Sequence, residues 1–383
     1  MKIANKYPFI YVHGMLGWGQ AIGIDKLSPY WGGTTGNLMN FLNSCGYESY
    51  SASVGPISSA WDNACELYAQ LMGTRVDYGK AHSEAHGHER YGRKYNEPLC
   101  QGFGERKVHL IGHSHGGQVI RLLTHLLTYG DEREKNATDP ADISPLFTGG
   151  KEDFIASVTT ICAPNNGSTF YNITDRYDLI HTLGRFSDFV MGIIGRTPLH
   201  GKYVDYQLEQ FGLTPIKGEK KPDKLIVAMN RVRDGEDYVL TDLSLEGAYE
   251  LNKLIEISKN IYYFAYCANG CVGEDHRTEN ISFPFLKYFG SLIISMGLPQ
   301  DNYGIKFDES WIDNDGLVNT PSAKNPFDEP AKEYDGKFEK GIWNIMPTLL
   351  CDHGAATGLL AEKKKIQSFY INLARMLINL ETE

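Results

Sequence analysis

The chain has 383 residues, of which 37 are Lys or Arg and 47 are Asp or Glu, giving a formal net charge of -10. This acidic balance argues against nucleic acid or an anionic membrane as the main partner. No apolar run approaches the length of a transmembrane helix, and the seven cysteines are too scattered to suggest a disulfide framework. An α/β chain of this length often forms one domain with insertions, so we expect a single soluble domain over 1–383.

The first predicted strand runs from Pro8 to Val12, a short apolar run typical of a buried strand. A glycine-rich turn follows it, with the sequence HGMLGWG at 13–19. In such a turn the amide of Met15 could face a reaction centre and bind an oxyanion. The turn could equally do no more than connect two elements, so its role depends on a nucleophile elsewhere in the chain.

The stretch from 62 to 100 is polar and contains glycine, and we expect it not to form a good core helix. It holds Asp62, His82, His86 and His88, whose oxygen and nitrogen donors suit zinc. Three histidines within seven residues could equally belong to a solvated turn. Spacing alone therefore leaves a metal site and a solvated turn as alternatives.

The most informative motif is GHSHG at 112–116, which lies between the apolar run Val108–Ile111 and a helical pattern from Gln118 to Leu127. A serine on a sharp turn between a strand and a helix is a nucleophile elbow, in which flanking small residues permit the tight turn. A serine hydroxyl is a weak nucleophile, so Ser114 needs a histidine base, a carboxylate and oxyanion donors. The backbone amide of His115 would be one of these donors.

A further predicted element lies within residues 165–215, after the apolar strand Ser157 to Ala163. Apolar residues recur there at intervals of three and four, which predicts an amphipathic helix with a wide apolar face. Packing against the core would explain such a face as well as a functional role would. The residues that define the stripe are Leu179, Leu183, Phe186, Val190 and Ile193.

Two carboxylates, Asp313 and Asp315, lie in a turn where we expect a strand to have just ended. Gly316 follows Asp315 and permits a tight turn that would direct this carboxylate toward a histidine. Position alone favours Asp315 only slightly over Asp313. The task of either residue would be to hold the imidazole of the base in the correct tautomer.

The best candidate for the base is His353, in a loop between the apolar stretch Ile342–Leu350 and a final helix predicted from about Leu360 to Leu380. The order serine, acid, histidine along the chain is typical of this architecture. Four other histidines follow the elbow, and for two of them, His125 and His276, a structural role is the better interpretation. The remaining two are His181 and His200.

Several motifs now occur together, which makes the combination highly specific. They are HGMLGWG at 13–19, YWGG at 30–33, VGPISSAWD at 54–62, VDYG at 76–79, SPLF at 144–147, NDGLVNT at 314–320 and DH at 352–353. On these motifs the chain resembles the secreted thermoalkalophilic lipases of Gram-positive bacteria. The resemblance implies an α/β-hydrolase fold, with a mostly parallel central sheet covered by helices on both faces. It also implies a zinc-binding region formed by 62–100 and 215–245, and a helical lid within 165–215.

The resemblance assigns Ser114, Asp315 and His353 to the catalytic triad, and so selects Asp315 over Asp313. It assigns the amides of Met15 and His115 to the oxyanion hole. The implied activity is that of a lipase or esterase, which cleaves fatty-acid esters such as triacylglycerols through an acyl-enzyme. Aliphatic polyesters are a further possible substrate. A thioesterase or a peptidase would use the same triad, and a non-catalytic binding module is the alternative from another class.

The resemblance also implies a zinc site whose ligands are Asp62, His82, His88 and Asp242, whereas His86 matches a family histidine that does not bind the metal. Four protein ligands leave no open position, so we expect a structural role for the zinc. The family's calcium site should be lost, because no carboxylate occupies the residues directly after the base at 354–361.

The relatives are exported, so the resemblance favours an extracellular protein whose signal peptide is absent from this chain. Seven largely unpaired cysteines fit a cytoplasmic location as the alternative. The sequence does not determine the oligomeric state or the preferred acyl-chain length.

Overall fold

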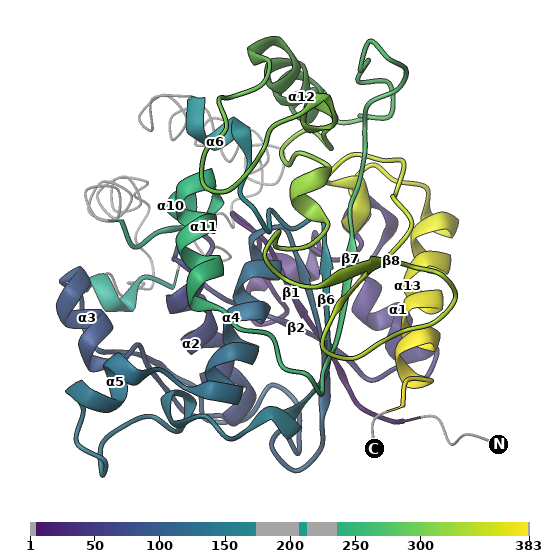
Figure 1. The fold of residues 1–383 in the computed structure, drawn as a ribbon. Coiled ribbons are helices and arrows are strands. Elements are labelled where there is room, and N and C mark those ends of the chain that lie inside the picture. Colours follow the sequence, from purple (N-terminus) through teal and green to yellow (C-terminus); the bar gives the residue numbers. More distant parts are fainter. Residues whose placement is uncertain (1–4, 174–206, 213–235, 382–383) are drawn as a thin grey trace.

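The computed structural model describes residues 5–173, 207–212 and 236–381 (Figure 1). Its main sheet has seven strands in the order β2-β1-β5-β6-β7-β9-β8, and every neighbouring pair is parallel. A separate antiparallel pair is formed by β3 and β4. The strands are β1 Phe9–Val12, β2 Ser49–Ala52, β3 Arg75–Asp77, β4 Tyr91–Lys94, β5 Val108–His113, β6 Ile155–Ile161, β7 Tyr262–Tyr266, β8 Ala331–Glu333 and β9 Trp343–Ile345.

Helices connect these strands and cover both faces of the sheet. Figure 1 shows α2 and α4 on one side of the sheet and α1 and α13 on the other. The helices are α1 Leu38–Ser44, α2 Ala60–Met72, α3 Lys80–His86, α4 His115–Tyr129, α5 Glu132–Ala137, α6 Thr169–Ile173, α10 Val239–Leu243, α11 Leu245–Leu254, α12 Pro284–Met296 and α13 Lys363–Ile378. Short 3-10 turns lie between several of them.

The central strands are buried on both faces, which explains why they read as nearly continuous apolar runs. In β1 the side chains alternate between two cores. Ile10 and Val12 join the core that contains α2 and α4, whereas Phe9 and Tyr11 join the core that contains α1 and α13. The expected α/β-hydrolase fold with helices on both faces is therefore confirmed.

Parallel strands end at a common edge of the sheet, and ligand-binding loops of α/β folds gather there. Here β5 ends at His113, immediately before Ser114, and β7 and β9 end at Tyr266 and Ile345. The loops that follow these strands carry the candidate catalytic residues. The fold thus brings together segments that are more than 200 residues apart in the chain.

Two expectations about local structure were wrong. Residues 60–72 form α2, a helix buried on nearly every side, although the stretch from 62 seemed too polar for the core. In addition, a 3-10 turn at Glu309–Ile312, not a strand, precedes Asp313, because the side chain of Asp308 accepts a hydrogen bond from the amide of Ser310 at 3.0 Å and starts the turn.

The predicted lid helix, with its apolar stripe from Leu179 to Ile193, lies outside the described residues. Of the 215–245 segment, residues 236–245 are described. Within the described parts of the chain, no helix is both long and apolar enough to cross a membrane.

Candidate active site and metal centre

Ser114 occupies the sharp turn between β5 and α4, with φ 56° and ψ -132°. A positive φ is uncommon for a residue with a side chain, and such strained positions occur often at functional sites. Gly116 permits this turn, because a Cβ at this residue would lie 2.4 Å from the carbonyl oxygen of Val12. The motif therefore encodes a backbone that holds the Ser114 hydroxyl at the edge of the sheet.

The glycine-rich turn after β1 approaches this serine closely. A Cβ at Gly14 would lie 2.6 Å from the Ser114 Cβ and 3.1 Å from its Oγ, so only glycine fits there. Met15 is the next residue in this turn. His115 begins α4, where backbone N–H groups at a helix N-terminus favour negative charge. Both predicted oxyanion residues thus belong to segments that adjoin Ser114.

The structure brings the predicted base and acid together. The Nδ1 atom of His353 lies 2.8 Å from Asp315 Oδ2, and both side chains are buried. The other oxygen of Asp315 accepts hydrogen bonds from the amides of Leu317 at 3.0 Å and Val318 at 2.8 Å. A carboxylate that is ionised only accepts hydrogen bonds, so His353 carries its proton on Nδ1 and keeps a lone pair on Nε2. This is the tautomer that a general base needs.

Asp313, the alternative acid, has a different partner. Its Oδ1 atom lies 2.9 Å from Nδ1 of His276, and its Oδ2 atom accepts a hydrogen bond from Asn269 at 3.0 Å. Both carboxylates belong to the same turn, but only Asp315 contacts His353. The histidine for which a structural role was favoured, His276, is thus the partner of the carboxylate that lies outside the candidate triad.

A further buried carboxylate, Asp352, fixes the loop that carries the base. It accepts hydrogen bonds from the amides of Ser282 and Ala355, each at 2.8 Å. Burial raises the pKa of this carboxyl group, while these amides favour its charged form. The sequence analysis used Asp352 only as part of the DH motif.

A second group of side chains converges between α2, α3 and α10. Asp62 lies in the first turn of α2, His82 on α3, His88 just after α3, and Asp237 just before α10. One donor atom from each of these four residues lies within 4.8 Å of the other three. His82 Nε2 is 3.3 Å from both Asp62 Oδ1 and Asp237 Oδ2, and His88 Nε2 is 3.3 Å from the same Asp237 oxygen.

The same four atoms are buried and have no hydrogen-bond partner among the described residues. Buried polar atoms are normally paired, so four such atoms directed at one point need a common partner. Two carboxylate oxygens and two imidazole nitrogens form a donor set for one divalent cation with four ligands. The group can therefore hold a metal ion.

Electrostatics agree with this interpretation. Burial opposes the charged form of His82, but the neighbouring carboxylates of Asp237 and Asp62 outweigh it and raise the pKa of His82 to about 9. Burial and the neighbouring Asp237 raise the pKa of Asp62. Binding of a metal would release protons from this group, because metal ligands must be deprotonated.

Asp242 was expected in this group, and the structure corrects that assignment. Its Oδ2 atom accepts a hydrogen bond from the amide of Ala60 at 2.6 Å and lies 3.2 Å from Nε2 of His115. Because α10 begins at Val239, the two aspartates point in different directions, and Asp237 takes the fourth position instead. Nothing in the local sequence distinguishes Asp237 from Asp242. His86, which was not expected to bind the metal, lies outside the group although its ring packs on His82 at 4.5 Å.

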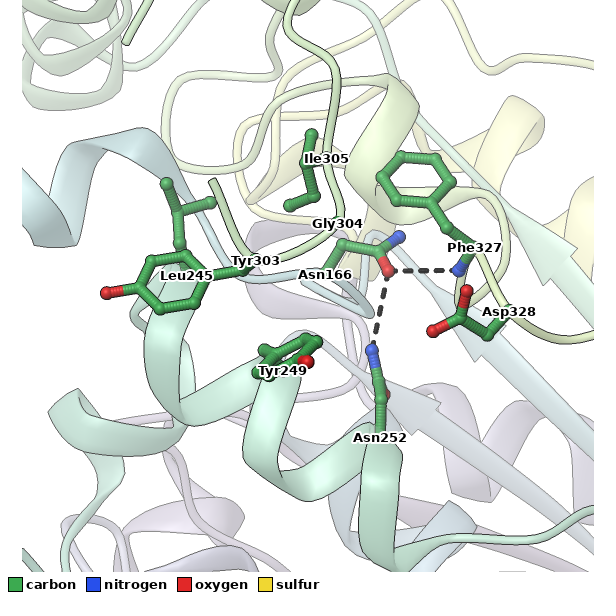
Figure 2. A pocket seen from close by; sticks show the side chains of 9 residues that line it. All are labelled: Asn166, Leu245, Tyr249, Asn252, Tyr303, Gly304, Ile305, Phe327 and Asp328. Atoms are coloured by element: carbon green, nitrogen blue, oxygen red, sulfur yellow. Dashed lines mark hydrogen bonds between the residues drawn. The ribbon is translucent and has the colours of Figure 1, made fainter. Parts of the chain in front are cut away.

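A surface pocket lies beside the loop that follows β6, and it shares no residue with the two groups above. Figure 2 shows aromatic rings around the amides of Asn166 and Asn252. Asn166 Oδ1 accepts hydrogen bonds from the amide of Phe327 at 3.1 Å and from Asn252 Nδ2 at 3.4 Å. The pocket therefore lies where this loop, α11 and the segment before β8 meet, and none of its lining residues is a candidate catalytic residue.

Comparisons with known proteins agree with this arrangement. Residues 5–383 match the family model described as "Lipase-like, C-terminal domain". The chain is 35% identical to a lipase of Staphylococcus hyicus over 398 residues, which is 98% of this chain and 58% of that protein. It is 33% identical to lipase 1 of Staphylococcus aureus, with 98% of this chain and 55% of that protein covered. The chain thus spans little more than half the length of these relatives.

Solved structures give the same result. Lipase 1 from Pelosinus fermentans superimposes with a TM-score of 0.84 at 36% identity, with 98% of this chain and 100% of that chain covered. EstA from Clostridium botulinum gives a TM-score of 0.84 at 35% identity, with 98% and 88% covered. The Staphylococcus hyicus lipase gives 0.80 at 33% identity, with 98% and 96% covered. The fold, the motifs and these matches together show that the chain belongs to the family of lipase-like C-terminal domains.

Proposed function

We propose that this protein is a serine carboxylic-ester hydrolase that cleaves fatty-acid esters such as triacylglycerols. The observation that carries the proposal is the contact between His353 and Asp315 at the sheet edge where the strained Ser114 turn is found. Relatives named lipases match nearly the full chain, and this favours esters over thioesters or peptides as substrates.

In the proposed reaction, His353 Nε2 removes the proton from Ser114 as the serine oxygen attacks the ester carbonyl. Asp315 keeps the proton of His353 on Nδ1 and stabilises the imidazolium that forms. The amides of Met15 and His115 bind the oxyanion of the tetrahedral intermediate, and loss of one such donor typically costs about 3 kcal/mol. His353 then protonates the departing alcohol, and water repeats the sequence to release the acid.

We further propose that the metal group holds zinc and that its ligands are Asp62, His82, His88 and Asp237. Four protein donors suit tetrahedral zinc and leave no position for a water nucleophile, so the ion would act on stability and not on the reaction. Bound there, zinc would connect α2, α3 and the residues before α10. As for location, the resemblance to exported lipases leads us to propose an extracellular protein.

The test is hydrolysis of a chain-length series of chromogenic fatty esters by wild type and by Ser114→Ala in parallel. We expect activity in the wild type that falls to the background rate in the variant, and the preferred chain length would separate a lipase from a short-chain esterase. Equal rates in the two proteins would refute the assignment of Ser114. If the folded wild type hydrolyses thioesters or peptides but not esters, the thioesterase or peptidase alternative is correct.

A further inference from the structure

Three hydrogen bonds connect the glycine-rich turn to the loop of the candidate base. The amide of Gly14 donates to the hydroxyl oxygen of Tyr30 at 3.0 Å, and that hydroxyl lies 2.7 Å from Nδ1 of His113. The other ring nitrogen of His113, Nε2, lies 3.0 Å from the carbonyl oxygen of His353. Tyr30 and His113, which lie outside the candidate triad, thus bridge the oxyanion turn and the base loop, although the two residues are 83 positions apart in the chain.

The chemistry of the groups at both ends determines where each proton lies. A carbonyl oxygen only accepts, so Nε2 of His113 must carry a proton and donate it to His353. Burial and the neighbouring His353 hold the pKa of His113 well below its usual value, so this ring is neutral. Its Nδ1 atom therefore has a lone pair and accepts the proton of the Tyr30 hydroxyl. Every donor in the bridge has one acceptor, and the direction of all three bonds is fixed.

Packing holds the bridge rigid. The His113 ring lies 5.8 Å from the Tyr30 ring and 6.1 Å from the Trp31 ring, and His113 and Trp31 are both almost fully buried. Its centroid is 4.6 Å from the ring of His353. At this distance a charged His113 would repel the imidazolium that forms on His353, so the neutral tautomer is the one compatible with general-base catalysis.

We infer that Tyr30 and His113 are positioning residues that hold the oxyanion turn and the base loop in the relative positions that ester hydrolysis requires. This inference rests on the proposed function, because it concerns the same reacting groups. Neither residue is assigned a contact with the substrate. Tyr30 acts through the amide of Gly14, the neighbour of Met15, and His113 acts through the backbone of His353. Loss of these relative positions should slow the chemical step more than it weakens substrate binding.

The first test compares Tyr30→Phe with Tyr11→Phe. Tyr11 is fully buried beside Trp31 at 5.0 Å between ring centroids, and its hydroxyl has no hydrogen-bond partner within the described part of the chain. Both substitutions remove one hydroxyl from a tyrosine ring that packs on Trp31, but only the first removes a link of the bridge. We expect Tyr30→Phe to lower kcat on the order of tenfold with KM unchanged, and Tyr11→Phe to retain kcat.

The second test separates positioning from packing at His113. The amide of His113→Gln can accept from Tyr30 and donate to His353, whereas His113→Leu can do neither. We expect the Gln variant to recover most of the kcat that the Leu variant loses. The low-field proton resonance of the His353–Asp315 pair, followed by NMR, should shift in the Leu variant and return in the Gln variant.

Equal kcat values for Tyr30→Phe and wild type, or equal losses in the Gln and Leu variants, would overturn the inference. A rise in KM with kcat unchanged would overturn it as well, because positioning predicts a loss in kcat. Failure of the proposed function itself would look different. In that case wild type and Ser114→Ala would have the same rate, whatever the state of the bridge.

Discussion

At the scale of single residues, the site depends on which carboxylate contacts which histidine. Asp315 and Asp313 are separated by one residue, yet Asp315 lies against His353 and Asp313 against His276. The difference arises from the turn at 314–318, in which the amides of Leu317 and Val318 bind Asp315 and fix its direction. Two similar side chains in the same turn should therefore have very different effects on the reaction.

We predict that Asp315→Asn lowers kcat by about 10⁴-fold, because an amide in place of the carboxylate would hold His353 in the wrong tautomer. The matched control is Asp313→Asn, which removes the same charge two positions earlier in the chain and should change kcat by less than about threefold, since it perturbs the contacts with His276 and Asn269 and not His353. Steady-state kinetics on the best ester substrate would measure both. Similar losses in the two variants would contradict the assignment of Asp315 as the acid.

At the scale of elements, the candidate metal group brings together residues from α2, from α3 and the turn after it, and from the segment before α10. His82 also stacks on Trp61 at 5.0 Å, and Trp61 stacks on Phe147 at 5.6 Å. A residue of the candidate metal group is thus part of an aromatic stack that continues into the core. Any change in metal binding should therefore be transmitted to the packing of α2.

We predict that Asp237→Ala abolishes stoichiometric zinc binding, whereas Asp242→Ala retains it. Removal of Asp237 leaves three donors, and a ligand of a structural zinc site is rarely replaceable. Asp242 instead holds the amide of Ala60 and the ring of His115. Metal content measured on purified protein would decide between the two aspartates. Loss of zinc in the Asp242 variant with full zinc in the Asp237 variant would restore the ligand set that the resemblance implied.

The helix α2 shows what sequence can and cannot predict at this scale. The polar, glycine-containing stretch 62–100 seemed unsuited to a core helix, yet even the polar residues Glu66 and Gln70 of α2 are buried. Glu66 accepts a hydrogen bond from the amide of Gly55, and Gln70 bonds both the amide and the carbonyl of Ser53. These partners lie on a loop after β2. Periodicity cannot reveal them, because a buried polar side chain is satisfied by tertiary contacts.

The motifs located Ser114 and the turn that carries Asp315, because both segments have their own backbone chemistry, whereas the choice of Asp315 over Asp313 rested on the family resemblance. GHSHG encodes a strained turn, and NDGLVNT encodes a turn whose amides hold a carboxylate. The fourth residue of the candidate metal group was not predictable in this way. Asp237 and Asp242 differ only in their position relative to the start of α10 at Val239, and this start is set by packing that the local sequence does not specify.

At the scale of the whole molecule, the candidate catalytic residues lie at one edge of a sheet that is packed between two cores. The two ends of the described chain also meet, because the amide of Asn5 donates to the carbonyl of Ile378 at the end of α13, at 2.8 Å. The metal group lies on the side of the sheet that α2 and α4 cover. Its residue His82 packs on Trp61, which belongs to the core on that side of the sheet.

We predict that a chelator lowers the thermal midpoint of the entire protein and that added zinc restores it. A ligand that binds only the folded state stabilises it by about 4 kcal/mol when its concentration is 1,000 times Kd. Because α2 belongs to the main core, the loss should shift one cooperative transition and not create a separate early one. Asp237→Ala should melt at the midpoint of the chelated wild type and show no response to either reagent. Equal midpoints of chelated and zinc-loaded wild type would mean that this group does not hold a structural metal.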